Sequence, residues 1–355
     1  MKFIFTNIKV ILIIIITYSN FSISQIGGNT SFNNLNRVYN ARSLALGGFY
    51  ISNKDQDPNI GVNNPALINQ TMMNHFSFNM LYQTGDIQNG MIVFNNYASK
   101  IKCFQNTSLR YVDYGKNTKT NEFGEIIGSF TPIDFILSSG LSKKLNSNFS
   151  IGSQLNFLYS QYENFNSIGV SIDFGGHYIF KDTTQSFAVL IKNAGIQLKT
   201  FGDNNKRNLP TEIQMSYSHK LKHAPFRFSY LFHHLNEWDL SYNDPNVKGS
   251  IDPLSGDSIL PKKASIIQKV ALHITPQIEL ILSNHIHLRF AFDYLRRYQF
   301  ALTNRPGLSG FSFGLGLYFK RFNLDYGFSS YSVAGNTNGI TLTSSLDKWR
   351  KKSIH

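Results

Sequence analysis

Residues Phe311–Phe319, with the sequence FSFGLGLYF, are the stretch that decides the expected fold class. Large apolar residues occupy nearly every second position, and Ser312, Gly314 and Gly316 stand between them. A period of two is typical of a β-strand whose two faces meet different surroundings. The same alternation begins near Asn74 and recurs through the rest of the chain. The chain is therefore expected to be built mainly from strands.

The length of these segments favours a membrane barrel over a soluble β-protein. Strands of soluble proteins cluster near five or six residues and turn their apolar face inward. The segments here run to about ten residues, the length that a tilted strand needs to cross a bilayer. We therefore predict an all-β fold, a transmembrane antiparallel β-barrel of the outer-membrane type with about 14 strands. The predicted strands are residues 74–83, 89–98, 103–113, 130–141, 148–160, 165–180, 185–193, 211–220, 226–235, 267–281, 286–297, 310–319, 322–331 and 339–347.

The connections between the predicted strands test this interpretation independently. Outer-membrane barrels pair short periplasmic turns with longer external loops. With the N-terminus in the periplasm, the long connections near residues 114–129, 194–210, 236–266 and 298–309 all fall on the external side. The turns on the other side are short. An even strand count near fourteen follows, because one missed or invented strand would break this alternation.

The N-terminus has the features of a secretory signal peptide. Lys2 and Lys9 precede the apolar run Val10–Ile16, and small polar residues lead to an expected cleavage after Ser24. A transmembrane anchor is the alternative, but a core of about ten apolar residues is too short against the roughly twenty that a spanning helix needs. We therefore expect an exported protein that enters the outer membrane after cleavage.

Composition agrees with an exported membrane protein. Aromatic residues make up 14% of the chain and charged residues only 15%, against roughly 25% charged residues in soluble domains. The single cysteine, Cys103, excludes an internal disulfide. The net charge of +13 could indicate nucleic acid, anionic lipid or an acidic partner. In an exported protein we expect outer-membrane lipid and lipopolysaccharide as partners, and no nucleic acid.

Residues 25–73 do not follow the strand pattern. Ala41–Gly48, with the sequence ARSLALGG, predicts a short helical turn closed by glycine, and Asn63–Ala66 predicts a turn or a helix start. Because polar backbone cannot lie against lipid, we expect this segment inside the barrel as an N-terminal lumenal plug. The expected organisation is a signal peptide at 1–24, the plug at 25–73, the transmembrane barrel at 74–347 and a basic periplasmic tail at 348–355.

No pattern of residues indicates a catalytic, cofactor-binding or metal site. His233 and His234 point to opposite faces of a strand, so we predict that they cannot hold one ion together. His285 and His287 share a face but lack further ligands. Ser-x-x-Lys occurs twice without the companion motifs of penicillin-binding enzymes. We therefore expect a protein that is not an enzyme.

Charged and imidazole side chains on the polar strand faces are candidate lumenal residues. They are Asp173, His177, Arg227, Glu279, Arg289 and Asp293. Charged groups at membrane depth often mark a transport path, and they could also form a hydrolytic pair. A hydrated lumen, which porin-like barrels have in any case, is the interpretation that we favour.

Both ends of the chain resemble a known family. The N-terminal residues that carry the resemblance include Gly27, Gly28, Phe32, Ala41, Arg42, Leu46, Gly47, Gly48, Asp57, Asn64 and Pro65, and the C-terminal ones include Gly310–Gly316 and Tyr326-Gly327. They are similar to the opening and the last strands of the PorV/PorQ family, FadL-like outer-membrane barrels of the Bacteroidetes type IX secretion system. The Ala-Leu-Gly-Gly form is closer to the PorQ branch.

The resemblance implies a fold and a role. The fold is a 14-stranded FadL-like barrel with an N-terminal plug. The role is that of a non-catalytic component that anchors a PorZ-like surface protein, beside PorU and PorV, in the complex that attaches secreted cargo to lipopolysaccharide. Loops near 194–210 and 236–266 would dock this partner.

Two other functions stay open. A FadL-like transporter of fatty acids or other hydrophobic solutes is the main alternative, and it requires an apolar lumenal pocket beside the plug. An outer-membrane hydrolase is the third, disfavoured because no serine, histidine and acid set can be assembled.

Overall fold

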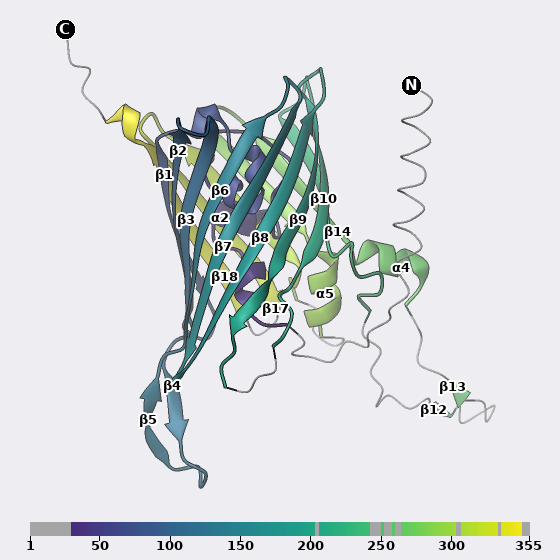
Figure 1. Ribbon diagram of the computed structural model, residues 1–355. Coiled ribbons are helices and arrows are strands. Elements are labelled where there is room, and N and C mark those ends of the chain that lie inside the picture. Colours follow the sequence, from purple (N-terminus) through teal and green to yellow (C-terminus); the bar gives the residue numbers. More distant parts are fainter. Residues whose placement is uncertain are drawn as a thin grey trace, which may run out of the picture.

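A closed antiparallel barrel forms the body of the molecule (Figure 1). The computed structural model describes residues 30–202, 206–241, 250–251, 258–259, 264–302, 307–332 and 335–349. Fourteen strands follow one another around the barrel, and β1 closes it by pairing with β18. The barrel strands are β1 (His75–Gln83), β2 (Ile87–Ala98), β3 (Cys103–Asp113), β6 (Ile133–Lys144), β7 (Phe149–Tyr162), β8 (Phe165–Ile179), β9 (Gln185–Lys199), β10 (Glu212–Lys220), β11 (Phe226–Phe232), β14 (Ile274–Ile281), β15 (Ile286–Phe292), β16 (Phe311–Tyr318), β17 (Phe322–Ser332) and β18 (Gly335–Ser345). The predicted barrel and its strand count are confirmed.

The alternating apolar and polar residues of the strands form the outer and the inner surface of the barrel. In β7, Phe157 is 53% exposed on the outside, whereas its neighbour Asn156 is fully buried inside. Phe78, Phe290 and Ile340 are likewise exposed on other strands. An apolar outer band of this kind is the surface that a bilayer requires of a barrel. Among the described residues, no helix is both long and apolar enough to cross a membrane.

The two ends of the barrel differ in the length of their connections. At one end, which we call the short-turn end, the strands are joined by turns such as 99–102, 145–148 and 319–321. At the other, the long-loop end, lie the connections 114–132, 200–211, 233–273 and 293–310. The first of these carries the hairpin β4 (Asn117–Thr120) and β5 (Ile126–Phe130), which projects from the barrel at the lower left of Figure 1. The third contains the short pair β12 (Ser250–Ile251) and β13 (Ser258–Ile259). The predicted grouping of long connections at one end is confirmed.

Two predicted strands extend too far at the long-loop end, because side chains cap helices there. The predicted strand 267–281 begins instead with helix α4 (Ile266–Ala271), whose first turn is capped by the Ser265 hydroxyl. The predicted strand 286–297 ends at Phe292, where the Asp293 carboxylate accepts a hydrogen bond from the Arg296 amide, 3.0 Å away, and starts helix α5 (Tyr294–Phe300). A side chain that satisfies a free helical N–H stabilises a helix start.

Several further strand ends differ from the prediction, and those of β9 and β11 lie at the long-loop end. Strand β9 continues to Lys199, past the predicted end at 193, because a β-bulge at Asn193 absorbs the break in alternation. Asn193 has a φ of 60°, and its amide donates to the Asp173 carboxylate. Strand β11 ends at Phe232, three residues before the predicted end at 235. The bulge explains why two consecutive buried residues occur inside a continuous strand.

Residues 30–73, here called the N-terminal segment, consist of short helical turns. They are η1 (Asn33–Asn36), α2 (Ala41–Ala45), α3 (Ile60–Asn63), η2 (Pro65–Leu67) and η3 (Gln70–Met72), and a last turn η4 (Leu346–Lys348) follows β18. Helix α2 ends at Gly47 and Gly48, whose amides donate to the carbonyls of Leu44 and Ser43. This pair of hydrogen bonds at the helix end requires a residue in the left-handed conformation, and Gly47 has a φ of 75°. The helical turn closed by glycine, predicted from the sequence, is observed.

Glycines in the wall let the N-terminal segment approach the barrel backbone. Helix α2 lies within the ring of strands in Figure 1 and contacts β15 to β18. A Cβ atom at Gly327 would lie 2.2 Å from the Ala41 carbonyl oxygen, and one at Gly314 would lie 2.3 Å from the Ala45 Cβ. Only a residue without a side chain permits such approaches.

Candidate functional site

Glu279 on the inner wall is the centre of a buried ion-pair network. Its carboxylate is 2.8 Å from Arg227 Nη1, 3.1 Å from Arg289 Nε and 3.0 Å from Arg42 Nη2. The Tyr50 hydroxyl donates a fourth contact at 2.9 Å. Arg227 and Arg289 come from strands β11 and β15, which flank Glu279 in the sheet, whereas Arg42 and Tyr50 belong to the N-terminal segment. The network therefore connects the segment to the wall.

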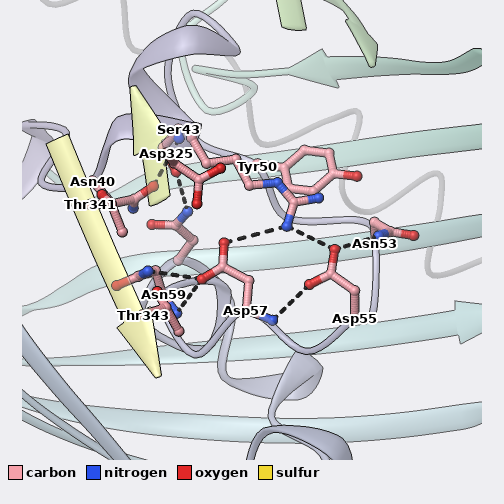
Figure 2. A network of polar contacts seen from close by, with 12 residues as sticks. Asn40, Ser43, Tyr50, Asn53, Asp55, Asp57, Asn59, Asp325, Thr341 and Thr343 are labelled. Atoms are coloured by element: carbon pink, nitrogen blue, oxygen red, sulfur yellow. Dashed lines mark hydrogen bonds and ion pairs between the residues drawn. The ribbon is translucent and has the colours of Figure 1, made fainter. Parts of the chain in front are cut away.

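Arg42 extends the network back into its own segment. Its Nη1 atom is 2.7 Å from Asp55 and 3.3 Å from Asp57. Figure 2 shows Asp55 and Asp57 side by side, with Asp57 also bonded to Asn59. On the wall, Arg289 forms a second ion pair, in which its Nη1 atom lies 2.6 Å from Asp325 Oδ1. Three guanidinium groups thus meet four carboxylates.

Because the network is buried, each of its charges depends on the others for pairing. Arg289 is fully buried, and Arg42 and Glu279 are 3% and 2% exposed. Moving a charge out of water costs several kcal/mol, and only good pairing offsets this cost. Losing one partner would leave another charge buried and unpaired. The network therefore holds the segment in one position.

A polar cavity lies beside the network and extends to the short-turn end. Its volume is about 820 Å³. Arg42, Asp57 and Arg227 line it, together with Lys220 at the end of β10 and Lys320 in the turn 319–321. A second cavity of about 520 Å³ lies at the long-loop end, where Phe32, Tyr114, Tyr162 and Phe201 contribute to its walls. The N-terminal segment contributes residues to both cavities.

The inner wall near the second cavity carries an apolar patch. The patch consists of Met91, Val93, Val112, Ile136 and Leu158, all pointing inward from β2, β3, β6 and β7. Four residues of the N-terminal segment cover it, namely Phe32, Leu35, Tyr39 and Val62. This patch explains why β2 alternates poorly in sequence. Met91 and Val93 face the N-terminal segment, while their neighbours Ile92 and Phe94 are exposed on the outer face.

Five of the six predicted lumenal residues lie on the inner wall. Arg227, Glu279 and Arg289 are brought together in the network. Asp173 accepts hydrogen bonds from the Asn193 amide and from Gln154 and Asn156, and a nitrogen of the His177 ring lies 3.0 Å from the Ser52 carbonyl oxygen. The sixth residue, Asp293, was wrongly placed on a strand face, because it caps α5 at the rim.

The residues of the predicted N-terminal motif mostly make structural contacts. The Ala41 amide donates to Thr341 in β18, and Leu46 packs in an apolar cluster with Tyr50 and Leu67. Asn64 caps η2, in which Pro65 takes the first position. Gly27 and Gly28 lie outside the described residues. Arg42 and Asp57 are the motif residues that join the charged network.

Several residues of the site were missed in the sequence. Asp55, Tyr50 and Asp325 complete the network, but nothing in their local sequence distinguishes them. The glycines that accommodate the segment did carry a signal, since glycine inside a strand pattern often marks a close backbone approach. Gly152 faces Pro65 and Gly175 faces Asn64 in this way.

The prediction that His233 and His234 point to opposite faces of a strand was wrong. Strand β11 ends at Phe232, and His234 adopts a left-handed conformation with a φ of 54°. The two Nδ1 atoms are therefore only 2.8 Å apart, and Glu212 lies close to both rings. Burial lowers the pKa of His233 to about 4, so its imidazole is neutral at neutral pH.

Comparisons with known proteins identify the architecture. No family model matches the sequence, and no curated protein matches it. Among solved structures, the chain is similar to a deletion mutant of the TodX monoaromatic hydrocarbon channel, with a TM-score of 0.53 at 12% identity over 87% of this chain and 99% of that one. The toluene transporter TodX of Pseudomonas putida matches with a TM-score of 0.50 at 12% identity, over 85% and 95% of the two chains.

The chain has a FadL-like outer-membrane barrel fold. A Pseudomonas aeruginosa FadL homologue is also similar, with a TM-score of 0.48 at 11% identity over 86% of this chain and 98% of that one. At these identities the likeness concerns the fold. The first two of these barrels are described as a hydrocarbon channel and a toluene transporter.

Proposed function

We propose that this FadL-like barrel is a channel for small hydrophobic solutes, with the N-terminal segment closing its lumen. The observation that carries this proposal is the apolar inner-wall patch of Met91, Val93, Val112, Ile136 and Leu158 beside the 520 Å³ cavity. An apolar wall that the N-terminal segment covers can bind an apolar solute once the segment moves away, because ligand pockets for such solutes are lined mainly by apolar side chains. The solved barrels TodX and its mutant, a toluene transporter and a hydrocarbon channel, support the same class of solute.

The proposed route begins at the long-loop end. A solute enters the cavity between Tyr114, Tyr162 and Phe201 and reaches Phe32, which covers the patch. Moving Phe32 and Leu35 aside exposes apolar wall in which the solute replaces them. Both residues are buried in this structure, which represents the closed conformation of the proposal. Passage further along the lumen then requires the rest of the segment to move.

Uptake by whole cells tests this proposal. Radiolabelled toluene and a long-chain fatty acid are supplied to Gram-negative cells that lack their own FadL-like barrels and express this chain. Ile136→Asn places an amide in the patch and is expected to lower uptake by about tenfold, the effect of a loss of roughly 1.4 kcal/mol of binding. Leu190→Asn is the matched control, because Leu190 is equally buried on the inner wall but packs in a different cluster. If cells that express the chain take up no more solute than cells that lack it, the proposal is wrong.

A scaffold of the type IX secretion system is the second candidate. The buried network around Glu279 favours it, because a segment held by this many ion pairs resists displacement. In this role the connections 200–211 and 233–273 bind a PorZ-like surface protein, with PorU and PorV in the same complex. Basic side chains at the turns, such as Lys320 and Arg321, would contact lipopolysaccharide or lipid phosphate.

Purification from native outer membranes tests the scaffold. The tagged chain is extracted in mild detergent and its co-purifying proteins are identified. Recovery of a secretion-system surface protein supports the role. If none is recovered, and deletion of the gene leaves surface attachment of cargo intact, the scaffold is excluded. Neither candidate function assigns a catalytic residue or a cofactor to the chain.

A further inference from the structure

Three side chains with metal-ligating atoms converge where strands β10 and β11 meet the long-loop end. Glu212 is the first residue of β10, and His233 and His234 directly follow β11. The His233 and His234 Nδ1 atoms are 2.8 Å apart, and Glu212 Oε1 lies 3.5 Å from the His234 Nδ1. One ligand atom from each residue lies within 4.8 Å of the others. The cluster is separate from the Glu279 network.

We propose that Glu212, His233 and His234 bind a divalent transition-metal ion, with Zn²⁺ as the best match. Two imidazole nitrogens and one carboxylate oxygen are a donor set that Zn²⁺ prefers. With metal–ligand distances near 2.0–2.1 Å, ligands of a tetrahedral site lie about 3.3 Å from one another. The observed separations of 2.8 Å and 3.5 Å fall on either side of this value. Small side-chain rotations therefore suffice.

Backbone strain indicates that the cluster is more than a chance contact. His234 holds a φ of 54°, which a side chain bearing a Cβ adopts only at a cost of about 1 kcal/mol. This conformation turns its ring toward His233 instead of the opposite face. Strained residues of this kind concentrate at ligand sites.

Space for a fourth ligand lies next to the cluster. Glu212, His233 and His234 line a pocket of about 140 Å³, and Asp293 and Gln214 line it too. This volume holds several water molecules, at roughly 30 Å³ each. A bound water is the usual fourth ligand of a zinc site with three protein ligands.

Lys192 sets a limit on the affinity of the site. Its amine lies 3.1 Å from Glu212 Oε2 and neutralises part of the carboxylate charge. The other oxygen, Oε1, is the one that faces His234. A neighbouring ammonium repels a divalent cation, so removing this charge would strengthen metal binding. Lys192→Met is therefore expected to bind Zn²⁺ at least tenfold more tightly.

Metal binding at this place would fix the base of the longest connection. The His233 amide donates to the His273 carbonyl at 3.0 Å, so the two ends of the connection 233–273 meet at the cluster. An ion held by Glu212 and both histidines joins the start of this connection to strand β10. The inference is independent of whether the barrel is a channel or a scaffold.

Metal titration of the folded protein in detergent micelles tests the inference. Zn²⁺ binding is measured by calorimetry, and Co²⁺ substitution by the visible absorption that tetrahedral coordination produces. We expect one ion per chain, and His234→Ala and Glu212→Gln are expected to weaken binding by about 100-fold. His285→Ala is the matched control, because His285 lies in the turn 282–285 at the opposite end of the barrel. The different electrophoretic mobility of folded and unfolded barrel checks that each variant is folded.

The inference is overturned if the folded parent protein binds Zn²⁺ no more tightly than folded His234→Ala, or if His285→Ala weakens binding as much as His234→Ala does. It is also overturned if Lys192→Met fails to raise the affinity of a folded protein, because a cation beside the ligands must oppose the metal. A histidine pair that only joins two loops by hydrogen bonding predicts these negative results.

Discussion

Arg42 and Glu279 are 237 residues apart in the chain and share two charge-assisted hydrogen bonds inside the barrel, from Nε at 3.2 Å and from Nη2 at 3.3 Å. Arg42 belongs to the N-terminal segment and Glu279 to strand β14. The carboxylate is shared with Arg227 and Arg289. This one contact links the N-terminal segment to the wall of the barrel.

Neutralising Glu279 should destabilise the barrel strongly. Glu279→Gln keeps the shape of the side chain but leaves the buried guanidinium groups of Arg42 and Arg289, and the partly buried one of Arg227, with a neutral partner. We expect a loss of about 3–5 kcal/mol in the free energy of unfolding, the range found when a buried ion pair is broken. Urea unfolding followed by tryptophan fluorescence measures it. Glu163→Gln, which breaks the half-exposed pair with Lys119, is the control and should cost less than about 1 kcal/mol. Equal losses in both variants would contradict the assigned role of the network.

A methyl group at Gly327 should dislodge helix α2. Its Cβ would lie 2.2 Å from the Ala41 carbonyl oxygen, and the other nearby atoms are also Ala41 backbone. We expect Gly327→Ala to cost about 1–3 kcal/mol and to speed amide hydrogen exchange at Leu44 to Gly48. Gly176→Ala is the matched control, because its Cβ would meet no atom nearer than 3.9 Å. Unchanged exchange in Gly327→Ala would show that α2 does not depend on this contact.

A disulfide between the segment and the wall should separate the two proposed functions. The hydroxyls of Ser52 and Ser216 are 2.9 Å apart, and both residues are buried. Ser52→Cys with Ser216→Cys, in a Cys103→Ser background, is expected to form a disulfide on oxidation. If the segment must move for solute to pass, oxidation abolishes uptake and reduction restores it. Full uptake by the oxidised protein would contradict the gating role of the segment. A scaffold should bind its surface partner equally in both states.

A charge on the outer band should oppose membrane insertion. Phe157→Arg in the middle of β7 is expected to cost about 2–4 kcal/mol, the penalty for arginine near the bilayer midplane. Leu145→Arg serves as the control, because Leu145 is equally exposed, at 53%, but lies in a turn at the barrel end. Refolding into lipid vesicles and urea titration compare the two variants. Similar penalties at both positions would argue against lipid contact at Phe157.

Local alternation was sufficient to predict the barrel but not its rim. Strands such as β7 and β16 were recognised because one face meets lipid along their whole length. The stretches after Ser265 and Asp293 are also rich in large apolar residues, as the strands are, and they were therefore predicted as strands. Their helical form depends on capping hydrogen bonds that alternation does not encode.

The candidate sites depended on contacts between distant parts of the chain. Arg227, Glu279 and Arg289 were recognised as lumenal from their positions on polar faces, but their union with Arg42 was not. The pair His233 and His234 was considered and rejected as a metal site, because His234 was assigned an ordinary strand conformation, and Glu212 was not considered. The left-handed turn that brings it to His233 and Glu212 has no local sequence signature.

The sequence by itself determined that this protein is a barrel of about fourteen long strands with its large connections at one end, because side-chain period and connection length are local properties. Only the tertiary structure decided how the lumen is filled. Barrel closure pairs β1 with β18 and brings β14 to face residues near the start of the chain. The Arg42 and Glu279 contact therefore exists only in the closed barrel, where burial makes their pairing obligatory.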